Sequence, residues 1–275
     1  MIVVFIILAL VVLAAIVYLI LSAPNSTRKR AGMENLTVDY AHRGFHGEGI
    51  PENSIPAFSA AVAAGFGVEL DVQLSSDGDV VVFHDYDLKR MCGEDTKLSS
   101  LRGAELSWRR LGKTQYNIPM LEDVLHTVRG RVPVLIELKG ENSDTALCEA
   151  VAGILSHYNG KYCVQSFNPY LLNYFKLHHP KVARGLLYTD YKKNASLSKI
   201  KRLMLGSMMT NFLARPDFIS VDESSLDAFP VRLMQKLHKL PTFVWTLRDP
   251  DRHARYRSMK YGRIFEGYDP GEPKK

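Results

Sequence analysis

Hydrophobic and polar residues divide the chain into two parts of unequal length. Residues 2–21 are twenty positions without a charge. A helix of that length is about 30 Å long at about 1.5 Å per residue, enough to cross the hydrocarbon core of a bilayer. From residue 38 onward, short apolar runs alternate with longer amphipathic stretches. We therefore predict a transmembrane helix over 1–21, a polar linker over 22–36 and one folded domain over 37–270.

The short apolar runs have the length and composition of β-strands, and the stretches between them have the spacing of helices. Strands are expected at 38–42, 68–72, 134–138, 162–165, 182–187, 218–221, 242–246 and 263–265. Helices are expected at 54–64, 121–128, 144–157, 170–178, 196–205 and 226–237. Eight strands separated by helices predict an α/β fold, the TIM (β/α)8 barrel. An open doubly wound sheet is the alternative, but residues 44–49 do not match its glycine-rich phosphate loop.

A tight turn at Asp77-Gly78 joins two β-rich runs, 68–72 and 80–85. Asp-Gly at such a place is a strong hairpin signal, because glycine accepts the positive φ that the turn requires. A turn centred there places Asp71 opposite His84, and Glu69 shares their face of the ladder. The pattern therefore predicts a metal site with an acid or base beside it.

Residues 86–119 follow this hairpin and are too many for a simple connection. Loops longer than about 12–15 residues usually have a function or a small fold of their own. We predict a small inserted subdomain after the second strand that caps the mouth of the barrel.

Charged and imidazole side chains gather at the predicted strand ends, and the carboxyl ends of parallel strands meet on one face of a barrel. The set comprises His42, Arg43, Glu69, Asp71, His84, Glu137 and Lys139. The three carboxylates suit a hard divalent cation such as Ca²⁺ or Mg²⁺. The two histidines suit general acid and base roles, and the two cations suit a bound phosphate. Together they predict phosphodiester cleavage.

Charge and cysteine content add little that is specific. The net charge is +6, and the densest basic stretch, 248–263, has no base-stacking aromatic motif, so nucleic acid is not an expected partner. No obligate protein partner is inferred either. Three cysteines without paired spacing agree with a reducing compartment.

The flanks of the apolar run predict how the chain sits in a membrane. Arg28, Lys29 and Arg30 follow the run and nothing basic precedes it, which by the positive-inside rule places the folded domain in the cytoplasm. A cleaved signal peptide is the alternative. It is disfavoured because its apolar core is usually about 7–15 residues and follows a basic segment. We expect a single-pass protein of the cell membrane.

Several motifs occur in a characteristic order. They are Ala41-His42-Arg43-Gly44, Pro51-Glu52-Asn53-Ser54, Glu69-Leu70-Asp71-Val72-Gln73, Val82-Phe83-His84-Asp85, Ile136-Glu137-Leu138-Lys139, Gln165-Ser166-Phe167 and Val244-Trp245-Thr246. In this order they resemble the glycerophosphodiester phosphodiesterase family over essentially the whole chain after the linker. The resemblance implies a TIM barrel with a bound divalent cation that hydrolyses small glycerophosphodiesters to glycerol 3-phosphate and an alcohol.

The resemblance also implies roles for individual positions. Its metal ligands match Glu69, Asp71 and Glu137, its paired general acid and base match His42 and His84, its phosphate-contacting positions match Arg43 and Lys139, an acidic site residue matches Glu52, and its glycerol pocket matches Phe167 and Trp245. The sequence departs from the usual pattern at 247–249 and 265–269, which bears on the alcohol that is accepted. Two alternatives remain: a lysophospholipase D or phospholipase-type enzyme on lipids, and a non-catalytic module that binds phosphorylated headgroups.

Overall fold

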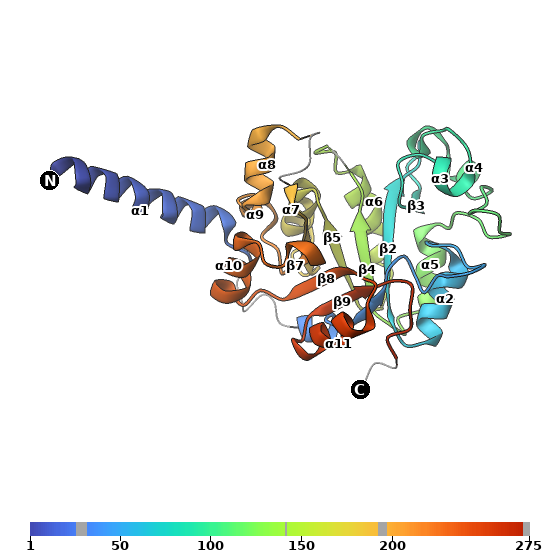
Figure 1. Cartoon of the computed structure of the whole chain (residues 1–275). Helices are drawn as coiled ribbons and strands as arrows, with labels where there is room; N and C mark the ends of the chain where they lie inside the picture. The colour runs from blue at the N-terminus through green and yellow to red at the C-terminus, as the bar shows by residue number, and fades with distance from the viewer. Residues whose placement is uncertain (26–31, 141, 192–196, 272–275) are drawn as a thin grey trace.

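Eight parallel strands close into a barrel in the computed structural model, which describes residues 1–25, 32–140, 142–191 and 197–271 (Figure 1). The strands are β1 (Asp39–Ala41), β2 (Gly67–Leu74), β4 (Val134–Leu138), β5 (Tyr162–Ser166), β6 (Arg184–Tyr188), β7 (Phe218–Asp222), β8 (Thr242–Leu247) and β9 (Gly262–Phe265). Each pairs in parallel with the next in this order, and β1 pairs with both β2 and β9, which closes the barrel. The predicted TIM barrel and its eight strands are confirmed.

Helices surround the barrel between the strands. They are α2 (Ile55–Ala63), α5 (Leu121–Val128), α6 (Ala146–Leu155), α7 (Pro169–His178), α8 (Lys199–Gly206), α9 (Asn211–Ala214), α10 (Phe229–His238) and α11 (Pro250–Ser258), with the 3₁₀ turns η2 (Met33–Asn35) and η5 (Glu223–Ser225). Side chains cap several amino ends; Ser54, for example, accepts from the backbone N–H of Ala57. All six predicted helices are present, although residue 196, the expected start of one of them, lies outside the described residues.

Aromatic rings fill the amino-terminal half of the barrel interior. Tyr40, Phe218 and Phe243 pack there with Leu135 and Ile264. Two of these rings require glycine on a neighbouring strand: a Cβ on Gly67 would lie 2.6 Å from the Tyr40 ring, and one on Gly185 would lie 2.1 Å from the Phe218 ring. A second core joins the outer faces of the strands to the helices. The charged side chains of the interior are thereby confined to the carboxyl ends of the strands.

The predicted hairpin register is wrong by one residue. Strand β3 (Val80–Val82) is antiparallel to β2, with Val72 opposite Val82, so Phe83 and not His84 is opposite Asp71. The cause is the turn: the backbone N–H of Ser75 donates to the carbonyl of Asp79 at 2.9 Å, which closes a three-residue loop over 76–78 with Gly78 at a φ of +92°. Such loops are common in hairpins, and they shift the pairing by one position relative to a two-residue turn.

Residues 86–119 fold on their own small core beside the barrel. They contain α3 (Lys89–Cys92), η3 (Leu98–Ser100) and α4 (Gly103–Leu106). Leu88, Leu98 and Leu106 pack there against Phe83. In Figure 1 this segment lies on the far side of the barrel from the N-terminal helix.

The N-terminal helix α1 (Ile2–Ser22) projects away from the barrel (Figure 1). Its apolar window has a mean hydropathy of 3.4 and is not buried against the rest of the chain. By length and composition it could cross a membrane, and a signal sequence would meet the same criteria.

Candidate active site

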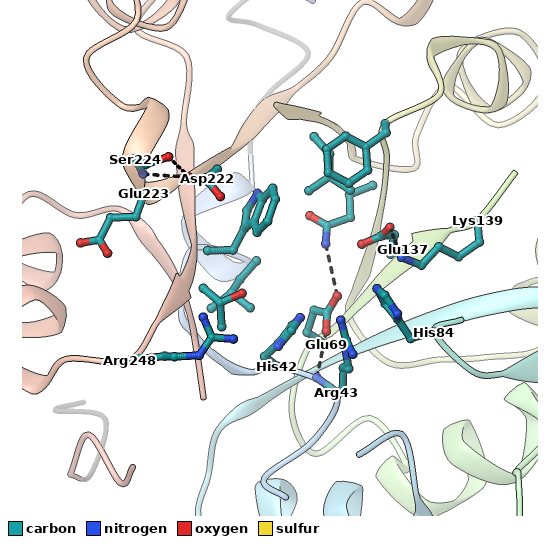
Figure 2. Close-up of a pocket in the computed structure, with 16 residues that line it drawn as sticks. His42, Arg43, Glu69, His84, Glu137, Lys139, Asp222, Glu223, Ser224 and Arg248 are labelled. Carbon is teal, nitrogen blue, oxygen red and sulfur yellow. Dashed lines mark hydrogen bonds and ion pairs between the residues drawn. The ribbon is translucent and has the colours of Figure 1, made fainter. Parts of the chain in front are cut away.

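A cavity of about 420 Å³ opens at the carboxyl ends of the barrel strands. In Figure 2 the side chains of His42, Arg43, Glu69 and His84 lie close together on one side of it, and Asp222, Glu223 and Ser224 lie across from them. Phe167, Trp245 and Arg248 are also in its lining. This is the face on which TIM barrels build their sites.

Three buried carboxylates meet at the base of this cavity. Asp71 of β2 is directly opposite Glu137 of β4 in the parallel ladder, and Glu69 lies two residues before Asp71 on the same face of β2. One carboxylate oxygen from each lies within 4.8 Å of the other two. Glu69 and Glu137 line the cavity. Asp71 is 1% exposed and accepts a hydrogen bond from Asn53 Nδ2 at 2.9 Å.

The charges of this group favour a bound cation. Burial and the neighbouring charges of Asp71 and Glu137 raise the pKa of Glu69 to about 7, against the opposing effect of His42. Burial likewise raises the pKa of Glu137. Lys139 Nζ lies 2.7 Å from Glu137 Oε1 and 3.1 Å from Asp71 Oδ1. The Arg43 guanidinium is a second cation beside this group, with its Nε 3.5 Å from Asp71 Oδ2. Two permanent cations beside three carboxylates leave one negative charge when all three acids are ionised, and an all-oxygen donor set fits Ca²⁺ or Mg²⁺.

His42 is held by an acid that directly follows the last strand. Its Nδ1 lies 2.8 Å from Oε2 of Glu266, which also accepts a hydrogen bond from Arg248 at 3.0 Å. Burial acts to lower the pKa of His42, but the hydrogen bond to Glu266 and the charge of Glu69 raise it on balance. Since the carboxylate occupies Nδ1, it leaves Nε2 as the nitrogen for proton transfer.

His84 has the same arrangement on the other side of the carboxylates. Its Nδ1 lies 2.6 Å from Oδ1 of Asp85, and Arg90 from α3 donates to Asp85 Oδ2 at 2.6 Å. The backbone N–H of Phe83 still donates to the carbonyl of Asp71 at 3.0 Å, and His84, the next residue, lines the cavity. The conclusion that His84 lies near the acids was therefore right, although the predicted pairing was not.

Arg43 is fixed by its backbone and by Glu52. It has a φ of +54°, which is uncommon for a residue with a side chain, and in this conformation its N–H donates to Glu69 Oε2 at 2.9 Å. Its guanidinium donates to Glu52 Oε1 at 2.8 Å. Glu52 also accepts from Arg90 at 2.7 Å and is not among the residues lining the cavity. Contact between Glu52 and substrate therefore stays a prediction, while its observed contacts hold Arg43.

Two aromatic rings form one wall of the cavity. Phe167 and Trp245 both line it and meet edge to face, with ring centroids 5.8 Å apart. Trp245 Nε1 is buried without a hydrogen-bond partner among the described residues. An apolar wall with a polar atom nearby suits a small polyol.

Sequence reasoning missed the residues that hold the histidines. Asp85 directly follows His84, and Glu266 directly follows the last strand. The rule that selected the other candidates, a charged residue at a barrel strand's carboxyl end, also applies to Glu266. Nothing in the sequence indicated that Glu266 faces His42, because that contact depends on closure of the barrel.

Comparisons with known proteins agree with this geometry. A model described as the Glycerophosphoryl diester phosphodiesterase family matches residues 42–265. The putative glycerophosphodiester phosphodiesterase YhdW of Bacillus subtilis is 27% identical over 237 residues, which cover 83% of this chain and 93% of that protein. Human Lysophospholipase D GDPD1 is 27% identical over 263 residues, covering 89% and 73% of the two chains.

Solved structures share the fold. The glycerophosphodiester phosphodiesterase of Thermotoga maritima is 28% identical with a TM-score of 0.65, covering 83% of this chain and 93% of that one. An Oleispira antarctica phosphodiesterase, solved in complex with the product sn-glycerol-3-phosphate, has a TM-score of 0.67 at 23% identity, covering 83% and 92%. This protein therefore belongs to the glycerophosphoryl diester phosphodiesterase family and is a phosphoric diester hydrolase.

Proposed function

We propose that the cavity hydrolyses glycerophosphodiesters to glycerol 3-phosphate and an alcohol, with a Ca²⁺ or Mg²⁺ ion held by Glu69, Asp71 and Glu137. One observation carries the proposal: the three acids meet between two histidines, His42 and His84, each of which has a carboxylate at Nδ1. Acids alone would indicate a cation site. The paired imidazoles add the proton transfers that hydrolysis requires.

The two histidines divide the proton transfers. One takes the proton of the attacking hydroxyl while the other protonates the leaving alkoxide, and each role typically contributes about 10²–10⁴-fold to the rate. When bound, a divalent cation polarises phosphoryl oxygens and lowers the pKa of a bound hydroxyl or water. The attacking group is either a water or the 2-hydroxyl of the glycerol moiety. Attack by the 2-hydroxyl releases a cyclic phosphate first, which ³¹P NMR of the reaction would detect.

Substrate contacts follow from the remaining lining residues. Arg43 and Lys139 carry permanent charge beside the acids and would bind phosphoryl oxygens. The Phe167–Trp245 wall would hold the glycerol carbons. The bound sn-glycerol-3-phosphate in the Oleispira antarctica enzyme supports a small phosphodiester as substrate.

A product assay with the 275-residue chain tests this function. Release of glycerol 3-phosphate from glycerophosphocholine and glycerophosphoglycerol is expected, with loss of activity in EDTA and recovery on adding Ca²⁺ or Mg²⁺. His42→Ala should lose at least about 10²-fold in kcat. His126→Ala, an exposed histidine on α5, is the matched control and should retain full activity. Unchanged turnover in a folded His42→Ala protein would contradict the proposal.

A lysophospholipase D is the second candidate, favoured by the similarity to human Lysophospholipase D GDPD1 over 89% of this chain. Measuring kcat/KM for water-soluble diesters against lysophospholipids and diacyl lipids in micelles would separate the two activities. A headgroup-binding module without activity is disfavoured, because binding alone does not require two carboxylate-paired imidazoles.

We also propose that α1 anchors the protein as a single membrane span with the barrel in the cytoplasm. The support is the length and apolar character of α1. The basic residues that suggest the orientation, Arg28, Lys29 and Arg30, lie outside the described residues. Protease treatment of intact cells should leave a C-terminal tag uncut, and permeabilised cells should lose it. Cleavage of the tag in intact cells would reverse the orientation.

A further inference from the structure

The carboxyl end of α1 is fixed to one flank of the barrel. Asn211 Nδ2 donates to the carbonyl of Ser22 at 2.7 Å, and Arg215 Nη1 donates to the carbonyl of Ala23 at 2.7 Å. Tyr18 donates its hydroxyl to the carbonyl of Ser207 at 3.1 Å. The last carbonyls of a helix have no partner within the helix, so these bonds satisfy groups that would otherwise need water. They give α1 a defined direction relative to the barrel.

The flank beside this junction carries exposed apolar side chains. Ile200 and Leu203 on α8 are 75% and 64% exposed, and Phe229 at the start of α10 is 70% exposed. Phe212 on α9 is also exposed. In Figure 1 these three helices lie next to the end of α1, on the side of the barrel away from α3 and α4. Large apolar side chains grouped on a surface usually mark an interaction site.

A groove of about 690 Å³ runs through this flank. Its apolar lining includes Tyr18, Tyr188, Tyr191, Leu203, Phe229 and Pro230, and its charged lining includes Lys199, Arg202 and Asp190. Tyr18 comes from α1 itself, so the groove is continuous with the membrane helix. Tyr188 directly follows Leu187, which lines the catalytic cavity, so the groove lies behind the same strand end as the active site.

The charges of α8 match an anionic lipid surface. Its sequence, Lys199-Ile200-Lys201-Arg202-Leu203-Met204-Leu205-Gly206, contains three cations and no acid. Helices that combine basic residues with an exposed apolar face bind in the interface of membranes with anionic lipids, and the negative surface potential of such a membrane attracts basic residues close to it.

The length of α1 indicates that this flank lies at the level of the lipid headgroups. Its 21 residues span about 30 Å, the thickness of the hydrocarbon core. The end of a membrane helix of this length therefore lies at the headgroup layer, where tyrosines such as Tyr18 are commonly found. Groups that contact this end lie at the same depth.

We propose that this membrane-facing surface, formed by Ile200, Leu203, Phe212 and Phe229 with Lys199, Lys201 and Arg202, docks on the anionic lipid surface of the bilayer that α1 spans. Its apolar side chains enter the interface and its cations pair with lipid phosphates. This inference rests on the proposal that α1 remains in the membrane. Its consequence is that the catalytic cavity is held at a fixed position beside the bilayer.

Tryptophan quenching by brominated lipids tests the docking. The full chain is reconstituted in nanodiscs of phosphatidylcholine and phosphatidylglycerol, with or without bromine on the acyl chains. Leu203→Trp and Phe229→Trp place a probe on the surface, Leu13→Trp places one inside α1, and Ser99→Trp places one at an exposed position of η3. Each is compared with the unmodified chain, whose Trp108 and Trp245 give a constant background.

Bromine should quench the added probe at positions 13, 203 and 229 and leave that at 99 unchanged. Quenching at 13 with none at 203 and 229 would overturn the docking and leave the anchor standing. No quenching at 13 would show that α1 is outside the bilayer and would remove the premise. A blue shift at 203 without bromine quenching, together with crosslinking between two chains, would assign the surface to a second copy and also overturn the proposal.

Reversing the charges of α8 tests whether its cations contribute to docking, because α1 alone would already hold the barrel close to the bilayer. The triple variant Lys199→Glu, Lys201→Glu, Arg202→Glu, carried with Leu203→Trp, should lose at least half of the bromine quenching. The matched control Lys97→Glu, Arg110→Glu, Lys113→Glu, at exposed positions of residues 86–119, should lose none. Both triples should hydrolyse a water-soluble diester at the unmodified rate. Equal quenching in the two triples would contradict a role for these cations.

Discussion

Nδ1 of His42 lies 2.8 Å from Oε2 of Glu266, a residue 224 positions later in the chain. The two meet because β1 and β9 are neighbouring parallel strands, with Ala41 opposite Phe265. His42 directly follows β1 and Glu266 directly follows β9, so the two side chains start from adjacent positions of the barrel. The hydrogen bond to His42 and its charge lower the pKa of Glu266 to about 2. Glu266 therefore remains an anion beside the imidazole near neutral pH.

Replacing Glu266 should slow turnover more than it weakens binding. Glu266→Gln keeps the size of the side chain and removes the charge that orients the His42 ring. Replacing the carboxylate that orients a catalytic imidazole with its amide can cost up to about 10⁴-fold in kcat, and we expect a loss of at least about 10-fold in kcat with KM nearly unchanged. Arg232→Gln is the control, because Arg232 pairs with Asp227 at an exposed position outside the cavity lining, and surface ion pairs contribute about 0–1 kcal/mol. An equal loss of kcat in both variants would argue against a positioning role for Glu266.

Asp85 should orient the imidazole ring of His84, as Glu266 orients that of His42. Asp85→Asn keeps a hydrogen-bonding group beside Nδ1, which lies 2.6 Å from Asp85 Oδ1, but allows the other ring tautomer, so kcat should fall by at least about 10-fold. Asp87→Asn changes a nearby exposed acid and should leave kcat unchanged. Steady-state kinetics on a water-soluble diester measure both. If Asp85→Asn and His84→Ala combine multiplicatively, the two residues do not act as a unit.

Cation affinity should depend on each of the three acids. Glu137→Gln removes one donor charge, and we expect the Kd for Ca²⁺ or Mg²⁺ to rise at least about 10-fold. The rise in Tm with added cation measures the affinity independently of turnover, because a ligand of the folded state stabilises it by RT ln(1 + [L]/Kd). Glu122→Gln, an exposed acid on α5, should show the unmodified Tm response. A Glu137→Gln protein with that same response would exclude Glu137 as a ligand.

Asp39 should govern stability in acid. Burial acts to raise the pKa of Asp39, but hydrogen bonds from His253 and Arg263 and their charges hold it well below its ordinary value. Its stabilising effect is therefore fully present above the unfolded pKa of about 3.9 and is lost as pH falls through the lower folded pKa. Asp39→Asn should lower the free energy of unfolding at pH 7 by about 3–5 kcal/mol, because it leaves buried cations without their acid.

The same variant should also lose part of the pH dependence below about pH 4. Urea unfolding from pH 7 to pH 2 measures both effects. Asp227→Asn, at a fully exposed acid paired with Arg232, should leave both unchanged. A free energy of unfolding for Asp39→Asn equal to that of the unmodified chain at pH 7 would contradict this account.

The sequence alone predicts the helices and strands and most residues of the candidate site. Strand and helix positions follow from local periodicity, and His42, Glu69, Asp71, His84 and Glu137 were found because barrel strands end on one face. The turn residues are also a local signal, but they predicted one hairpin register wrongly. Asp77-Gly78 marked the hairpin, but the hydrogen bond between Ser75 and Asp79 set the loop at three residues, and a single residue changes the partner across a ladder.

Tertiary structure alone decided which groups hold the candidate catalytic side chains. Glu266 reaches His42 only when β9 closes on β1, and Arg43 reaches Glu69 only through a backbone conformation with positive φ. The membrane-facing surface likewise requires α8, α9 and α10 to gather at the end of α1. Periodicity and turn residues report on neighbours along the chain, whereas these contacts join segments far apart in the sequence, and their geometry exists once the barrel has closed.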